Sequence, residues 1–201
     1  MPSKGFSLTK TIIGFLRHGQ TDWNIDFRLQ GTTDIPLNET GRQQAREVAG
    51  LIRAADWDAL ITSPLSRAAD TAAIVSGLAL MPSAEVEPLL LERAFGVGEG
   101  LTYEEWSERF RGLDVIPGGE TVVELADRVN LLLETLLTKH RGKRVLAVSH
   151  GALIRKVIEI CSDYTLPLEG QRFRNASLST IIHTDDSGWR VLKFEPEQYQ
   201  G

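Results

Sequence analysis

The sequence predicts a layered α/β fold with a mostly parallel sheet for this chain of 201 residues. Short apolar runs alternate with segments of helical periodicity, which is the pattern of parallel strands joined by helices. The last two apolar runs, 177–183 and 189–194, are separated by an Asp-Asp-Ser-Gly turn and predict a hairpin that adds an antiparallel edge. The length favours one large domain, or at most two small ones.

The first elements follow from apolar runs and breakers. Residues 11–16 are apolar and predict a buried strand, and residues 20–37 are polar with Gly31 and Pro36 as breakers, so they predict a long loop. Asn38 is a favourable N-cap for a helix whose apolar residues share one face, namely Ala45, Val48, Ala49 and Ile52.

The middle of the chain predicts two strands and two helices. Residues 57–62 form a second strand, followed by a helix through about Ser76 with Ser63 as its N-cap and Pro64 at its first position. Residues 85–91 predict a third strand, whose Pro88 suits an edge position. Residues 102–111 predict a short helix.

The last third contains the clearest patterns. Thr121 and Glu124 match a capping box, and the apolar residues behind them recur at helical spacing until Gly142 ends the helix. Residues 144–149 form a strongly apolar strand, and a helix to about Cys161 follows it.

Composition excludes several classes of protein. There are 22 Lys and Arg against 27 Asp and Glu, so the formal net charge is −5, and a wide basic face for nucleic acid or anionic membrane is not expected. One Cys excludes an internal disulfide and a Cys-rich zinc site. We see neither a signal peptide after Met1 nor an apolar run of membrane-spanning length, and we therefore expect a cytoplasmic protein.

Unusual polar residues follow three of the predicted strands. Arg17, His18 and Gly19 end the first strand, Ser63 and Arg67 follow the second, and His150 and Gly151 follow the late apolar strand. Parallel sheets bind ligands beyond the carboxyl ends of their strands, so two Arg and two His should meet there. Guanidinium and imidazole donors suit a tetrahedral dianion, which predicts a phosphate site.

These residues resemble the histidine phosphatase superfamily, also called the phosphoglycerate mutase-like family. The resemblance covers roughly residues 12–183, and its segments occur in the family's order. They are Arg17-His18-Gly19-Gln-Thr21-x-Trp23-Asn24, Gln30-Gly31, Asp34-x-Pro-Leu37 with Thr40-Gly41, Ser63-Pro-Leu-Ser-Arg67, Glu92-x-x-x-Gly96-x-x-Glu99-Gly100, Pro117-Gly-Gly-Glu120 and Val148-Ser-His150-Gly151. The resemblance implies one domain over 1–201 with a three-layer sandwich, in which helices flank a mostly parallel mixed sheet.

The resemblance also implies a role for each matched residue. His18 matches the nucleophile that becomes a phosphohistidine, and Glu92 matches the acid that protonates the leaving oxygen and later activates water. Residues that match holders of the phosphoryl oxygens are Arg17, Arg67 and His150. Residues that match further contacts of the substrate are Asn24, Gln30, Gly31 and Gly151. The resemblance implies no metal and no other cofactor, because arginine and histidine neutralise the charge.

The resemblance leaves the reaction open between phosphatases and mutases. Cofactor-dependent mutases carry an insertion after the acidic segment, with a Lys and an Arg pair, which this short chain lacks. We therefore expect a phosphatase acting on a small phosphorylated metabolite, with a phosphoglycerate mutase as the alternative and an inactive phosphate-binding module as a third reading. Homodimers are common in such families, so a homodimer is also an expectation.

Specificity is expected between Phe95 and Ile116, and two interpretations stay open. Aromatic and apolar residues there could face a ring-bearing leaving group, namely Phe95, Val97, Trp106 and Phe110, although Trp106 and Phe110 also suit a core pair. Arginines there could instead pair with a substrate carboxylate or be surface charges, namely Arg93, Arg109 and Arg111.

Overall fold

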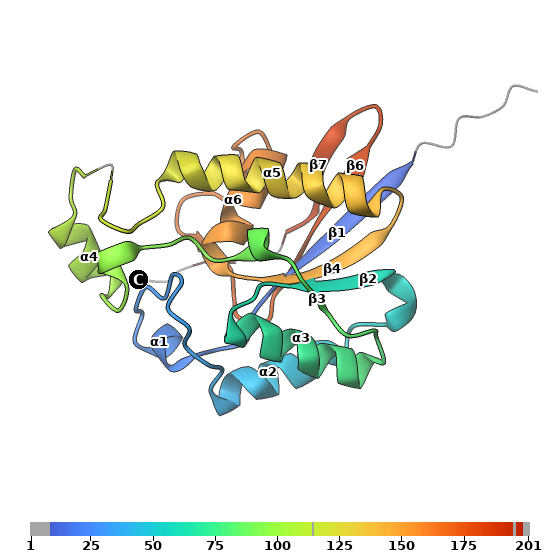
Figure 1. Ribbon diagram of the computed structural model, residues 1–201, viewed down its shortest axis with the longest axis horizontal. Coiled ribbons are helices and arrows are strands. Elements are labelled where there is room, and N and C mark those ends of the chain that lie inside the picture. Colours follow the sequence, from blue (N-terminus) through green and yellow to red (C-terminus); the bar gives the residue numbers. More distant parts are fainter. Residues whose placement is uncertain (1–8, 114, 195, 199–201) are drawn as a thin grey trace, which may run out of the picture.

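The computed structural model describes residues 9–113, 115–194 and 196–198. The expectation about a signal peptide concerns residues 1–8, which lie outside the described residues. A six-stranded sheet runs in the order β3-β2-β4-β1-β6-β7, with helices on both faces (Figure 1). Its strands are β1 Lys10–Arg17, β2 Ala59–Thr62, β3 Glu85–Val86, β4 Arg144–Ser149, β6 Leu178–Thr184 and β7 Gly188–Lys193.

The predicted mostly parallel mixed sheet is confirmed. Strands β3, β2, β4 and β1 pair in parallel, whereas β6 pairs antiparallel with β1 and β7 antiparallel with β6. The terminal hairpin therefore forms the antiparallel edge, as its turn sequence predicts. A separate two-stranded ribbon of β5 Gln171–Arg172 and β8 Glu197–Gln198 was not predicted, because strands of two residues have no periodicity to detect.

The helices cover both faces of the sheet and give three layers. They are α1 Asp22–Ile25, α2 Glu39–Ala49, α3 Ser66–Ala79, α4 Tyr103–Arg109, α5 Val122–His140 and α6 Gly151–Cys161. Alternate side chains of β1 enter opposite layers, as strand geometry requires. Ile13 and Phe15 pack with residues of α5 and α6, and Leu16 packs with residues of α2 and α3. No helix in the described ranges combines the length and the apolarity needed to cross a membrane.

Three local predictions were wrong. The segment 85–91 is a strand only over Glu85–Val86, and Pro88 begins a 3-10 turn, Pro88–Leu90, because proline favours the first position of a helix. Ser63 does not cap α3, whose N-cap is Leu65, so Pro64 lies outside the helix. The loop 20–37 contains the short helix α1.

The short helix α1 has a local cause. Thr21 and Asn24 form a capping box, in which each side chain meets the other residue's backbone N–H. The same device begins α4 at Thr102 and α5 at Thr121. Each box satisfies backbone donors that the first helical turn leaves without partners.

Two glycines should respond oppositely to alanine. A Cβ on Gly14 in β1 would lie 2.3 Å from Trp57 Cη2, whereas a Cβ on Gly77, exposed in α3, meets no atom within 4 Å. Gly14→Ala is expected to lower the free energy of unfolding by about 1–3 kcal/mol through overpacking. Gly77→Ala should raise it by about 0.5–1 kcal/mol, because glycine is a poor helix former. Urea denaturation of both variants measures the two changes, and a stabilised Gly14→Ala protein would contradict the packing described.

Candidate active site

The carboxyl ends of β1, β2 and β4 bring the predicted polar residues together. Arg17 is the register partner of Ser149, so His18 and His150 follow on neighbouring strands with ring centroids 5.2 Å apart. A cleft of about 1970 Å³ opens over these strand ends. Eight of the nine predicted site residues line it, namely Arg17, His18, Asn24, Gln30, Gly31, Arg67, Glu92 and Gly151. The ninth, His150, is fully buried behind them.

The His18 ring has a defined tautomer. Its Nδ1 lies 2.7 Å from Gly19 O, and because a carbonyl oxygen only accepts, Nδ1 carries the proton and Nε2 the lone pair. The residue is 2% exposed, and burial followed by the charges of Arg17 and Arg67 lowers its pKa well below the usual range of histidine. The imidazole is therefore neutral at physiological pH, with a nucleophilic nitrogen available.

Arg67 and His150 form a buried pair behind His18. Arg67 Nε donates to His150 Nδ1 at 3.2 Å, so His150 Nε2 carries the proton and donates to Ser63 Oγ at 2.7 Å. Burial, followed by the charge of Arg67, lowers the pKa of His150 well below its usual range. Both ring nitrogens thus bind protein groups, and contact with a phosphate would require His150 to release one of them.

The remaining donors of Arg67 fix the loop that faces the cleft. Nη1 donates to Thr33 O at 2.9 Å and Nη2 donates to Gly31 O at 2.7 Å. Gly31 has φ +54°, and a Cβ there would lie 2.0 Å from Glu99 Oε1, so only glycine fits. One buried guanidinium therefore holds the loop and orients His150.

Arg17 lies at the floor of the cleft. Its Nη1 donates to Phe173 O, while its buried Nε has no hydrogen-bond partner among the described residues. The Oε1 atom of Gln30 is likewise buried without such a partner. Buried polar atoms are usually hydrogen-bonded. An unsatisfied donor on Arg17, in a cleft that also presents Gly151 at the N-terminus of α6, suits an anionic ligand.

The Glu92 carboxylate is held at the N-terminus of α6. Oε1 accepts from the backbone N–H groups of Arg93 at 2.9 Å and Leu153 at 3.0 Å, and Oε2 accepts from Ala152 at 3.1 Å. Arg128 fixes the chain just before Glu92, since its Nη1 donates to two carbonyl oxygens of residues 89–91. Glu92 therefore has one orientation, with a free lone pair on Oε2.

Two polar residues support the loop side of the cleft. Asn24 Oδ1 accepts from Asn175 Nδ2 at 3.1 Å, and Asn175 Nδ2 also lies 3.1 Å from His18 O. The Glu99 carboxylate accepts from the backbone N–H groups of Thr32, Thr33 and Phe95. Burial raises the pKa of Glu99, but the Thr33 side chain and these N–H groups lower it more, so the net pKa is below its usual value.

Sequence reasoning missed four supporting residues, namely Ser63, Glu99, Arg128 and Asn175. The sequence places Ser63 after a strand and also suggests it as a helix cap, but it does not predict the contact of its hydroxyl with His150. Glu99 appears in the family segment without a role. Arg128 and Asn175 carry no local signal for the site, because the site residues that they contact are distant in the sequence: Glu92 lies 36 residues from Arg128 and His18 lies 157 residues from Asn175.

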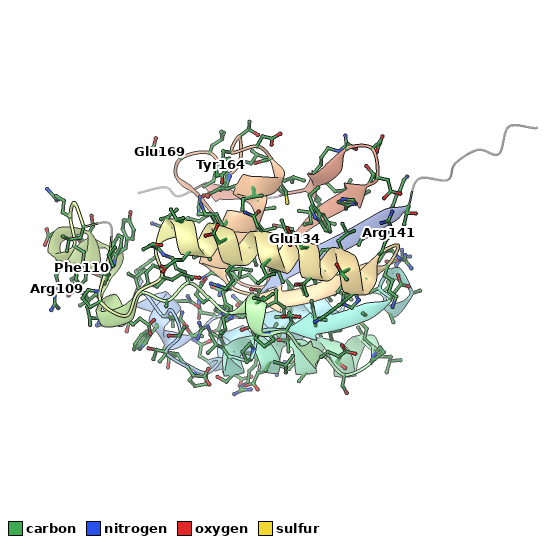
Figure 2. All side chains as sticks on the ribbon, turned by 45° about the horizontal axis from the view of Figure 1, so that its top comes forward. Arg109, Phe110, Glu134, Arg141, Tyr164 and Glu169 are labelled. Atoms are coloured by element: carbon green, nitrogen blue, oxygen red, sulfur yellow. The ribbon has the colours of Figure 1, made fainter. Side chains whose placement is uncertain are left out.

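The proposed specificity segment 95–116 contributes only partly. Phe95 and residues 102–104 line the cleft, whereas the other aromatic and basic candidates are not among its lining residues. Arg93 donates to Glu120 O, and Trp106 packs on Gly98, where a Cβ would lie 2.6 Å from its Cδ1. Figure 2 shows Arg109 and Phe110 at the outer end of α4, away from the sheet. Of the two interpretations of the arginines, surface charge fits Arg109 and Arg111, which are exposed and do not line the cleft, and Arg93 does not line it either.

Comparison with known proteins identifies the family of the chain. Residues 13–196 match the family model of the histidine phosphatase superfamily (branch 1). The chain belongs to this superfamily. It is a phosphatase, since its relatives in the superfamily include proteins named for that activity.

Three relatives illustrate the range of the superfamily. The chain is 38% identical to the uncharacterized phosphatase PhoE of Bacillus subtilis, over 92% of this chain and 94% of that protein. It is 36% identical to a probable phosphoglycerate mutase GpmB of Photorhabdus laumondii, over 88% of each. The structure of mycobacterial glucosyl-3-phosphoglycerate phosphatase with VO3 superposes with a TM-score of 0.75, at 28% identity, over 90% of this chain and 96% of that one.

The two buried histidines of this superfamily member predict a pH-dependent stability. His18 and His150 stay neutral in the folded state, whereas the unfolded chain protonates them below about pH 6.5. The unfolded state then binds more protons, so the free energy of unfolding falls as pH falls, by up to roughly 1.4 kcal/mol per histidine per pH unit. Urea denaturation between pH 7.5 and 5 measures this slope.

The control for this prediction is the double variant His18→Asn/His150→Asn, which should have a flatter profile below pH 6.5. Part of the slope should remain, because burial also lowers the pKa of His140. An unchanged slope in the double variant would show that other groups cause the acid destabilisation.

Proposed function

We propose that this phosphatase hydrolyses small phosphate monoesters through a phosphohistidine on His18. The single observation that supports this most is the Nδ1–Gly19 O hydrogen bond, which leaves the Nε2 lone pair available in a cleft with Arg17 and Arg67. A neutral imidazole nitrogen beside two guanidinium groups is equipped to attack phosphorus in an ester dianion.

In the first step His18 Nε2 forms a bond to phosphorus while the ester P–O bond breaks. The leaving oxygen takes a proton from Glu92, which holds it on Oε2, the oxygen with the single backbone contact. Arg17 and Arg67 stabilise the negative charge on the equatorial oxygens, and Gly151 allows the phosphoryl group to approach the N-terminus of α6.

In the second step water attacks the phosphoryl group and the P–N bond breaks. Glu92 Oε2 accepts the proton of the water, so that the acid of the first step is the base of the second. His18 regains its lone pair and inorganic phosphate leaves. The guanidinium groups supply the positive charge that this reaction needs, and we therefore expect turnover to persist in the presence of a chelator.

The phosphohistidine itself is the most direct test of this proposal. Brief incubation with a 32P-labelled ester, followed by denaturation in alkali, should leave one label per chain that is stable to alkali and released by acid. Peptide mapping should place it on His18. The proposal would be overturned if the ester were turned over while no quenched time point contained an acid-labile label, and if a His18 variant kept full activity.

The alternative reading as a phosphoglycerate mutase is kept because a 36% identical relative carries that description. A mutase would interconvert 2- and 3-phosphoglycerate, accelerated by bisphosphoglycerate, with little release of phosphate. The chain lacks the insertion with the additional Lys and Arg pair, which favours transfer to water.

The role of Glu92 predicts a dependence on the leaving group. Glu92→Gln keeps the size of the side chain but supplies no proton, so kcat/KM for an alkyl phosphate should fall by about 10²–10⁴-fold. An aryl phosphate with an acidic phenol as leaving group needs no protonation in the first step, so the variant should retain a normal burst of that phenol before slow turnover. Stopped-flow measurement of the phenol burst tests this. A fall in the rate of the aryl burst as large as the fall in kcat/KM for the alkyl ester would rule out the acid role.

A further inference from the structure

Four arginines line the cleft beyond the His18 site. Arg28 is paired with Asp26 and donates to Gly100 O, and we call the other three together the basic wall. Arg155 comes from α6, whereas Arg172 and Arg174 come from the segment that follows it in the chain. None of the three belongs to the family segments that mark the phosphate site, and the mechanism proposed above gives them no role.

Helix geometry places Arg155 at a defined distance from the phosphate site. Gly151 and Arg155 are four residues apart on α6, so they share one face and are separated by about one helical turn of 5.4 Å. Gly151 itself lies against Arg17, because a Cβ added to it would be 3.5 Å from Arg17 Nε. Arg155 is therefore one turn beyond the position where the phosphoryl group binds in the proposed mechanism.

The segment 171–174 is attached to the same site. Phe173 O accepts a hydrogen bond from Arg17 Nη1, and the Phe173 side chain is buried at 6% exposure. Residues 171–174 all line the cleft, and burial alternates along them as in an extended chain, so Arg172 and Arg174 are exposed where Phe173 is buried.

The guanidinium group of Arg155 is held in place by this segment. Its Nη2 donates to Gln171 O, and its Cζ lies 5.7 Å from the centre of the Phe173 ring. A guanidinium that is oriented before a ligand arrives loses little conformational freedom on binding, which strengthens recognition.

The charges of the basic wall and the phosphate site act on one another. Burial lowers the pKa of Arg155 and of Arg17, and the charge of Arg172 lowers both further. Nearby carboxylates include Glu92, which raises the pKa of Arg17, Glu159, which raises the pKa of Arg155, and Glu169, which lines the cleft. Figure 2 shows Glu169 on the loop that leaves α6. An anion between the guanidinium groups would relieve their mutual repulsion.

We propose that the basic wall binds a second anionic group on the leaving portion of the substrate, about one helical turn from the phosphoryl group. Favoured substrates would then be small phosphate esters that carry a carboxylate or a second phosphate, in preference to esters of neutral alcohols. Arginine suits both anions, because its planar fork donates two parallel hydrogen bonds. This inference rests on the proposed function, since it extends the same cleft.

Matched esters test the basic wall with the full chain. Glycerol 3-phosphate and 3-phosphoglycerate differ only by a hydroxymethyl group against a carboxylate, and glycerol 1,3-bisphosphate supplies a second phosphate. We expect kcat/KM for at least one of the two charged esters to exceed that for glycerol 3-phosphate by about 10-fold or more. The preferred ester identifies whether the second anion is a carboxylate or a phosphate.

Charge-removing variants then assign the preference to the wall. Arg155→Gln keeps a donor for Gln171 O but loses the charge, and it should lower kcat/KM for the preferred ester by about 10–100-fold. Arg174→Gln should act in the same direction. For glycerol 3-phosphate the change should stay within about threefold. Arg190→Gln on β7 is the matched control, because Arg190 is exposed and is not a cleft-lining residue.

Binding measurements separate this inference from the proposed mechanism. In a His18→Asn background, calorimetric titration should show tighter binding of the charged ester than of glycerol 3-phosphate, and Arg155→Gln should remove the difference. If the wild type turned over no ester, the proposed function would fail while this titration still decided the role of the wall. The inference would be overturned if charged and neutral esters had equal affinities and equal kcat/KM values. It would also be overturned if Arg155→Gln lowered kcat/KM equally for both kinds of ester.

Discussion

His18→Asn is expected to reduce phosphate release by on the order of 10⁴-fold or more. Asparagine can place an amide near Gly19 O, but it has no nucleophilic nitrogen at the position of Nε2. The remaining groups can still bind a phosphate ester, so KM or the inhibition constant of vanadate should change far less than kcat. Steady-state assays with an aryl phosphate, which reports every release of phenol, measure both quantities.

The matched control is His183→Asn, because His183 lies on β6 against Trp189, with ring centroids 5.1 Å apart. This variant should retain wild-type kcat. Thermal unfolding of both variants shows whether the fold is intact. A folded His18→Asn protein with more than a few per cent of wild-type kcat would exclude the phosphohistidine and leave only direct attack by water.

Arg67→Lys is expected to have the second largest effect, a fall in kcat/KM of about 10²–10³-fold. Lysine keeps the positive charge, but one ammonium group cannot reach Gly31 O, Thr33 O and His150 Nδ1 together. The loop of Gly31 and the His150 ring would lose their common anchor, and the positive charge would no longer sit at a fixed position.

Two measurements distinguish this from a simple loss of charge. Arg42→Lys in α2 is the control, since Arg42 is a partly exposed residue paired with Asp70 at 3.4 Å, and its activity should stay within about twofold. Vanadate, a phosphate analogue, should inhibit the Arg67→Lys protein more weakly than the wild type. If the Arg67→Lys protein kept both the vanadate affinity and the kcat/KM of the wild type, the guanidinium group of Arg67 would have no role in the site.

Much of the fold could be predicted because its signals are local. The capping box at Thr121 fixes the start of α5, and the apolar run of β4 matches the observed Arg144–Ser149. Errors occurred where local signals are ambiguous. An apolar run such as 85–91 suits either a strand or a tight turn, and a serine before a proline resembles a cap even where its hydroxyl binds a distant histidine.

By itself the sequence determined the layered α/β fold. It also predicted that Arg17, His18, Arg67, His150 and Gly151 meet, because parallel strands place their following residues at one edge. The other four predicted site residues, Asn24, Gln30, Gly31 and Glu92, came from the resemblance to the superfamily. Only the tertiary structure decided the state of those residues. The tautomer of His150, the anchoring of Gly31 by Arg67 and the basic wall of Arg155, Arg172 and Arg174 depend on contacts between distant segments. Such contacts are set by hydrogen bonds and burial in the folded chain, and these leave no periodicity in the sequence.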